Sequence, residues 1–240
     1  MFNLVPMKRP ILIYIIIAII TLISSCTVTE DITLTGDGGR VSSSIDIESY
    51  FVDVLEDFSE FMPKSDERII DSAISQAADQ LSTSGYASNV VFIKDGENSY
   101  IGDFDFNNLT DLMKAFSEST EQDVIRKGEN SIDFYVDINN YSKLESLIPF
   151  LSDPNIEVYL ARYNVGYSEQ DYLDMLVFSL GEEAPESVKK STITLKFTVP
   201  GEITKLEGAT KTGSNSFTYS FRLIDFLLLS SPLAFSVEWK

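Results

Sequence analysis

The sequence contains no histidine and a single cysteine among its 240 residues. Without histidine, the chain has neither a Ser-His-Asp nor a Cys-His catalytic arrangement, and no imidazole ligand for a metal. One cysteine also excludes an intrachain disulfide and a cysteine zinc site. We therefore expect no catalytic residues, no metal site and no cofactor.

Positive charge is scarce as well. The chain has 18 Lys and Arg against 37 Asp and Glu, a net charge of −19. Because nucleic-acid binding rests on Lys and Arg contacts to phosphate, we expect no nucleic-acid partner. Apolar residues, in contrast, make up 44% of the chain and aromatic residues 12%. This is the composition of a folded protein rather than of a disordered acidic tail.

The N-terminal segment has the composition of an export signal. Lys8 and Arg9 precede an almost uninterrupted apolar run over residues 11–23. A membrane-spanning helix needs roughly 20 apolar residues, whereas the apolar core of a secretory signal has roughly 7–15. We therefore expect residues 1–25 to be a signal peptide that is cleaved off.

Ile23, Ser24, Ser25 and Cys26 follow directly at the end of the apolar run. An aliphatic residue, two small residues and a cysteine in this place resemble the lipobox of bacterial lipoprotein signal peptides. The resemblance implies that signal peptidase recognises Ile23, Ser24 and Ser25, and that Cys26 carries diacylglycerol and becomes the acylated N-terminus. The acyl chains would make the membrane a partner of the protein. An uncleaved N-terminal anchor helix is the alternative.

The residue after the cysteine bears on which membrane is used. In lipoproteins of bacteria with two membranes, Asp at this position tends to retain the protein at the inner membrane, and here the position holds Thr27. The resemblance therefore favours the outer membrane. We expect the body to lie on the periplasmic or extracellular face.

Hydrophobic periodicity in the remaining chain predicts both helices and strands. Apolar residues recur at helical spacing near residues 50–62, 65–81, 109–116, 141–151 and 168–180. Alternation predicts strands near residues 28–34, 41–47, 89–93, 99–106, 132–138, 156–163, 193–199, 203–206, 217–221 and 233–239. The pattern predicts an α+β fold in which amphipathic helices pack on one side of an antiparallel-rich sheet. We expect residues 26–240 to form a single body, with sub-lobes 26–120 and 121–240 as the alternative.

The C-terminal strands contain a second pattern. A strand from Phe197 ends in Pro200-Gly201, an aliphatic Ile203 follows, then Glu207-Gly208 and a strand containing Tyr219. This stretch, residues 192–239, is similar to the C-terminal half of the LppM-like lipoprotein domain, although that family usually has Asn and Trp where this chain has Glu207 and Tyr219. The resemblance implies an envelope domain for which lipid binding has been proposed. An ordinary β-hairpin region is the alternative.

Two groups of side chains are candidates for a site. The first comprises carboxylates that could act as an acid/base pair in glycan hydrolysis, unless they are simply solvated: Asp133, Asp137, Glu157, Glu182 and Glu183. The second belongs to the apolar stretch 223–235, which is either buried core or the wall of an apolar ligand cavity. The candidate wall residues are Phe226, Leu227, Leu228, Leu229 and Phe235.

Taken together, these features predict a lipid-anchored envelope lipoprotein without enzymatic activity. Its body is expected to bind an apolar ligand, such as a lipid, or an envelope protein. Two alternatives stay open: a surface-exposed adhesin or antigen, and a carboxylate-only glycan hydrolase.

Overall fold

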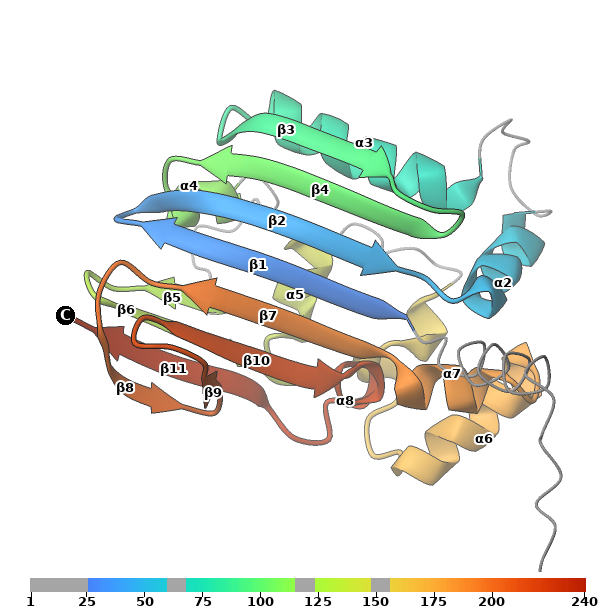
Figure 1. The fold of residues 1–240 in the computed structure, drawn as a ribbon. Coiled ribbons are helices and arrows are strands. Elements are labelled where there is room, and N and C mark those ends of the chain that lie inside the picture. Colours follow the sequence, from blue (N-terminus) through green and yellow to red (C-terminus); the bar gives the residue numbers. More distant parts are fainter. Residues whose placement is uncertain (1–25, 60–67, 115–123, 148–155) are drawn as a thin grey trace, which may run out of the picture.

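A curved sheet of seven strands, sheet A, dominates the structure, which is a computed structural model that describes residues 26–59, 68–114, 124–147 and 156–240. In spatial order the strands are β3 (Ala87–Lys94), β4 (Ser99–Phe106), β2 (Gly38–Asp46), β1 (Thr27–Thr35), β7 (Thr192–Thr198), β10 (Ser216–Arg222) and β9 (Thr210–Lys211) (Figure 1). Neighbouring strands are antiparallel except β1 and β7, which run parallel with Thr27 opposite Thr192. Sheet A therefore combines strands from both ends of the described chain.

A smaller sheet, sheet B, packs against the part of sheet A that contains β7 and β10 (Figure 1). Its strands, in order, are β5 (Ile125–Lys127), β6 (Ser131–Val136), β11 (Leu233–Trp239) and β8 (Ile203–Glu207), and all are antiparallel. Burial alternates along β11, where the odd-numbered residues Leu233, Phe235, Val237 and Trp239 are buried. One face of sheet B is thus apolar and faces the core.

Aromatic rings fill the space between the two sheets. Phe235 of β11 lies 5.2–5.5 Å, centroid to centroid, from Phe134, Phe197, Phe217 and Tyr219. Offset and edge-on ring pairs at such distances add to the free energy gained by burying the rings. This aromatic cluster holds sheets A and B together.

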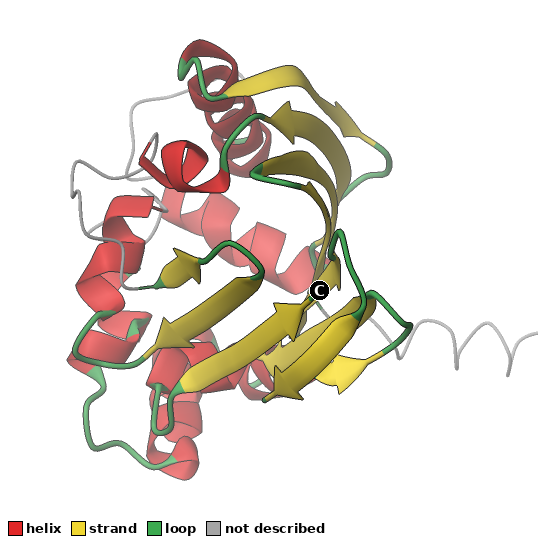
Figure 2. Cartoon of the chain, turned by 90° about the vertical axis from the view of Figure 1, so that its left-hand side faces the viewer, coloured by secondary structure: helices red, strands yellow, loops and turns green. Residues whose placement is uncertain are grey.

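The helices lie on one side of sheet A, as Figure 2 shows. One group lies behind the sheets and consists of α3 (Ile69–Thr83), α4 (Leu109–Lys114) and α5 (Tyr141–Leu147). A second group lies at the end of the molecule where β1 begins and consists of α2 (Ser49–Ser59), α6 (Glu169–Leu180), α7 (Ala184–Lys190) and α8 (Leu223–Leu228) (Figure 1). Its shared core includes Tyr172, Leu176, Val188 and Ile224. The predicted α+β fold with an antiparallel-rich sheet is confirmed.

The prediction of a strand over residues 156–163 was wrong. The segment forms two short 3-10 helices, η2 (Glu157–Tyr159) and η3 (Ala161–Tyr163). The buried Asn164 explains the difference, because its side-chain amide donates hydrogen bonds to the carbonyls of Val158 and Leu160 at 3.1 and 2.9 Å. Such side-chain bonds to the backbone compete with a strand ladder.

Helix α7 and strand β5 are among the elements that were not predicted. The sequence predicts that the helix over residues 168–180 ends at Gly181 and Pro185. In the structure, Pro185 lies in the first turn of a further helix, α7. Proline suits that position because the first amide groups of a helix have no partner within it. Strand β5 has three residues, too few for a visible alternation. The predicted helix ends near residues 60–62, 115–116 and 148–151 lie outside the described residues.

Candidate functional site

Cys26 joins the folded body directly, without a tether. It stands immediately before β1, and its carbonyl accepts a hydrogen bond of 3.0 Å from the amide of Thr192. Its Sγ accepts a hydrogen bond of 3.3 Å from the amide of Glu48. Ile23, Ser24 and Ser25, the predicted peptidase-recognition residues, lie outside the described residues. A group attached to Cys26 would therefore leave the body right at the start of sheet A.

The surroundings of the Cys26 thiol keep it protonated. Burial raises its pKa to about 11; the amide of Glu48 and the hydroxyl of Ser191 lower the pKa, and the Glu48 carboxylate raises it. Oxygen Oε2 of that carboxylate is buried and has no hydrogen-bond partner. Because the thiolate is the nucleophile, a thiol with such a pKa reacts poorly near neutral pH.

The helices at this end are tied to one another close to Cys26. Tyr50, in the first turn of α2, donates a hydrogen bond of 2.6 Å from its hydroxyl to the carbonyl of Leu180 at the end of α6. Ser191, which follows α7, accepts a hydrogen bond of 2.9 Å at its carbonyl from the amide of Leu223 in α8. We call this region the anchor end: Cys26, Glu48 and helices α2, α6, α7 and α8.

The predicted apolar wall residues lie in and just after α8 and on β11. Leu228, Leu229 and Phe235 are buried, whereas Phe226 and Leu227 are half-buried. The ring of Phe226 lies 5.6 Å from that of Tyr141 in α5. Phe235 belongs to the aromatic cluster described above. These residues pack against other side chains of the protein, so their contact with a ligand stays a prediction.

The predicted carboxylates are distributed over several elements. Asp137 accepts hydrogen bonds from the amides of Asn139 and Asn140 at 2.9 and 3.1 Å, and these bonds shape the turn that leads into α5. Glu157 accepts a hydrogen bond of 2.7 Å from the hydroxyl of Tyr163. Glu182 and Glu183 are exposed between α6 and α7. Asp137 and Glu157 thus have structural partners of their own.

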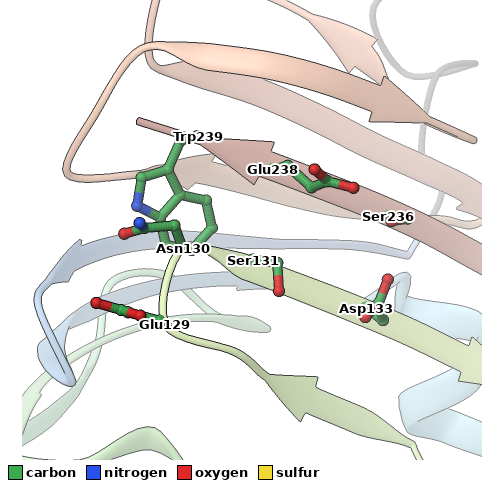
Figure 3. Close-up of a pocket in the computed structure, with 7 residues that line it drawn as sticks. All are labelled: Glu129, Asn130, Ser131, Asp133, Ser236, Glu238 and Trp239. Carbon is green, nitrogen blue, oxygen red and sulfur yellow. The ribbon is translucent and has the colours of Figure 1, made fainter.

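Asp133 lines a hollow of about 360 Å³ on the outer face of sheet B. Figure 3 shows its lining residues, which are Glu129, Asn130, Ser131, Asp133, Ser236, Glu238 and Trp239. Asp133 of β6 pairs with Ser236 of β11, and Ser131 with Glu238, so their side chains share one face. We call this the acidic hollow. The alternation of polar and apolar residues along 131–133 and 236–238 is a signal for such a polar face. The pairing of β6 with β11, which brings the two segments together, is not visible in the sequence.

The described residues hold no group of three or more cysteine and carboxylate side chains placed to bind a metal ion. Within the same residues, no helix has the length and apolar character needed to cross a membrane. The acidic hollow offers carboxylate, hydroxyl and amide groups, which can accept hydrogen bonds from a polar ligand.

The sequence matches no family model and no curated protein. Among solved structures, it is similar to the NMR structure of the folded domain of the LppM protein from Mycobacterium tuberculosis. The identity is 10%, the match covers 90% of this chain and 89% of that chain, and the TM-score is 0.38.

Proposed function

We propose that the protein is a lipid-anchored bacterial envelope lipoprotein whose body acts by binding and not by catalysis. The observation that supports this most directly is the position of Cys26. It ends the lipobox-like stretch after the apolar run 11–23 and it also begins the folded body, one residue before β1. An acyl anchor at Cys26 would keep sheet A next to the membrane surface.

The anchor has a simple energetic basis. Each CH₂ group buried in the bilayer contributes about 0.8 kcal/mol, so two or three acyl chains hold a protein firmly. The body carries a large excess of acidic residues, which keeps it soluble beside the headgroups. Thr27 favours transfer to the outer membrane where the cell has two membranes, with the body on the periplasmic or extracellular face.

A binding role agrees with the chemistry of the described residues. The chain lacks histidine, and Asp137 and Glu157 are engaged in local hydrogen bonds. Cys26 would carry the anchor and would then have no free thiol. The proposed ligand is a lipid or an envelope protein, and the residues proposed to contact it are Phe226 to Leu229 and Phe235.

The experiment is metabolic labelling of the full chain with palmitate in a bacterial host, comparing the native chain with Cys26→Ser. We expect label and a shortened chain for the native protein, and an unlabelled precursor of full length for Cys26→Ser. Thr27→Asp is the matched control, since it changes the next residue and should keep the label. Label that persists in Cys26→Ser would contradict the proposal.

A glycan hydrolase that uses carboxylates only is a second candidate, and the acidic hollow favours it. Asp133 and Glu238 lie on neighbouring strands and face the same hollow (Figure 3). This candidate requires the native protein to cleave a bacterial cell-wall glycan and both Asp133→Asn and Glu238→Gln to lose that activity. Absence of cleavage by the native protein would eliminate it.

A further inference from the structure

Phe178 is the most exposed large apolar side chain of the described residues. It lies two residues before the end of α6 and is 94% exposed, and the adjacent Val177 is 41% exposed. The opposite face of the same helix is buried through Tyr172, Leu173 and Leu176. Helix α6 thus has an ordinary buried face and, in addition, an apolar tip that nothing in the described structure covers.

This tip belongs to the anchor end of the molecule. The carbonyl of Leu180, two residues beyond Phe178, accepts a hydrogen bond of 2.6 Å from the hydroxyl of Tyr50. Tyr50 comes two residues after Glu48, whose amide donates to Sγ of Cys26 at 3.3 Å. Figure 1 shows α2, α6 and α7 together at the end where β1 begins. Phe178 and Cys26 therefore belong to the same end of the molecule.

The chain that precedes Cys26 indicates what lies next to this end of the molecule. Residues 1–25 end directly before Cys26 and contain the apolar run 11–23, which is suited to a lipid environment. We propose that Phe178, together with Val177, inserts into the phospholipid bilayer that holds the anchor, and so fixes the orientation of the body on the membrane. This proposal rests on the proposed membrane anchor.

The charges near the tip select the kind of lipid. Glu182 and Glu183 are exposed immediately after α6. The nearby Lys189 and Lys190 lie 3.5 and 3.8 Å from carboxylate oxygens of Glu186. With Glu182 and Glu183, the three carboxylates outnumber the two lysines, so this region offers no excess of positive charge to an anionic headgroup. Attraction of anionic lipids depends on an excess of basic residues. The partner is therefore a zwitterionic phospholipid surface, entered through apolar contact.

The experiment uses the tryptophan fluorescence of the full chain, purified in detergent and reconstituted into phosphatidylcholine vesicles with brominated acyl chains. The native chain supplies the baseline, because its single tryptophan, Trp239, is buried and lies at the end opposite Cys26, beside Ile203. Phe178→Trp places a probe at the tip. Tyr86→Trp is the matched control, since Tyr86 is also exposed but precedes β3 at the far end of sheet A.

We expect brominated lipid to quench the added emission of Phe178→Trp at least two-fold more than that of Tyr86→Trp, with a shift to shorter wavelength. Equal quenching of the two variants would overturn the proposal. Stronger quenching in vesicles containing phosphatidylglycerol would overturn the assignment to zwitterionic lipid. A dimer in detergent that Phe178→Ser abolishes would assign the tip to a second copy of the chain and would also overturn it.

Palmitate label measured on the same preparations separates this proposal from the proposed function. Label without Phe178→Trp quenching overturns membrane insertion and leaves the lipid anchor standing. Quenching without label supports insertion and overturns the lipid anchor. Folding is controlled by Phe178→Ser, which should melt at the temperature of the native chain because the side chain makes almost no contacts within the body.

Discussion

Glu30 lies directly opposite Ser43 in the β1–β2 ladder, and the Ser43 hydroxyl donates a hydrogen bond of 2.5 Å to the Glu30 carboxylate. Both residues point to the inner face of sheet A, and Ser43 is buried. Burial raises the pKa of Glu30 from 4.5 to about 7, although the hydrogen bond from Ser43 acts in the opposite direction. We therefore expect this carboxyl group to make the stability of the body depend on pH.

The first prediction concerns this pH dependence. Because the pKa of Glu30 is higher in the folded protein, folding takes up a proton between about pH 4.5 and 7. The resulting stabilisation is complete below pH 4.5 and is lost as the pH rises through 7. The difference is about 3 kcal/mol, at about 1.36 kcal/mol for each unit of pKa.

Glu30→Gln should remove this contribution, because the amide keeps the size of the side chain and can still accept the Ser43 hydrogen bond. Urea unfolding of native and variant chains at about pH 5 and about pH 8 measures it. Asp31→Asn is the control, since Asp31 is the exposed neighbour. An unchanged pH dependence in Glu30→Gln would show that another group is responsible.

The second prediction tests whether Phe235 belongs to the core of the protein or to the wall of a ligand cavity. Its ring contacts four other rings between the two sheets, so Phe235→Ala should lower the free energy of unfolding by about 3–5 kcal/mol. Phe235→Leu, which keeps more of the volume, should cost less. Denaturant unfolding checks both variants. A loss below about 1 kcal/mol for Phe235→Ala would contradict a role in the core.

The third prediction concerns a glycine that makes room for a ring. Gly102 of β4 lies opposite Phe92 of β3, and a Cβ atom at Gly102 would collide with the Phe92 ring. Gly102→Ala should therefore destabilise the protein by about 1–3 kcal/mol, as overpacking does. Combining it with Phe92→Ala should relieve the collision, so that the two effects are not additive in a double-mutant cycle. Additive losses would mean that the cost of Gly102→Ala does not come from a collision with the Phe92 ring.

The fourth prediction concerns the start of α6, the helix that carries Phe178. The Ser168 hydroxyl accepts a hydrogen bond of 3.2 Å from the amide of Asp171, and the Asp171 carboxylate accepts one of 3.0 Å from the amide of Ser168. Ser168→Ala should cost about 1 kcal/mol, as loss of an N-cap does. Ser168→Asp, which keeps a capping oxygen, should retain most of the stability. Thermal unfolding of the three chains gives the comparison, and equal melting temperatures would argue against the cap.

Local patterns were sufficient for much of the fold. Ser168 and the spacing after it predict α6, and the alternation of Ile132, Phe134 and Val136 predicts β6. The Asn108 side chain accepts a hydrogen bond of 3.1 Å from the amide of Asp111 at the start of α4. These features depend on hydrogen bonds and apolar faces within a few residues, which a single stretch of sequence contains.

Some features of the candidate site are also visible in the sequence, whereas others depend on the tertiary structure. The apolar run and the four residues ending at Cys26 form a contiguous motif, so the sequence by itself supports the proposed anchor. Tertiary structure alone decided that Thr27 lies opposite Thr192, that Asp133 and Glu238 face one hollow, and that Phe178 lies exposed at the same end of the molecule as Cys26. Each depends on which distant segments pair, and that choice is made by the free energy of burying the whole core.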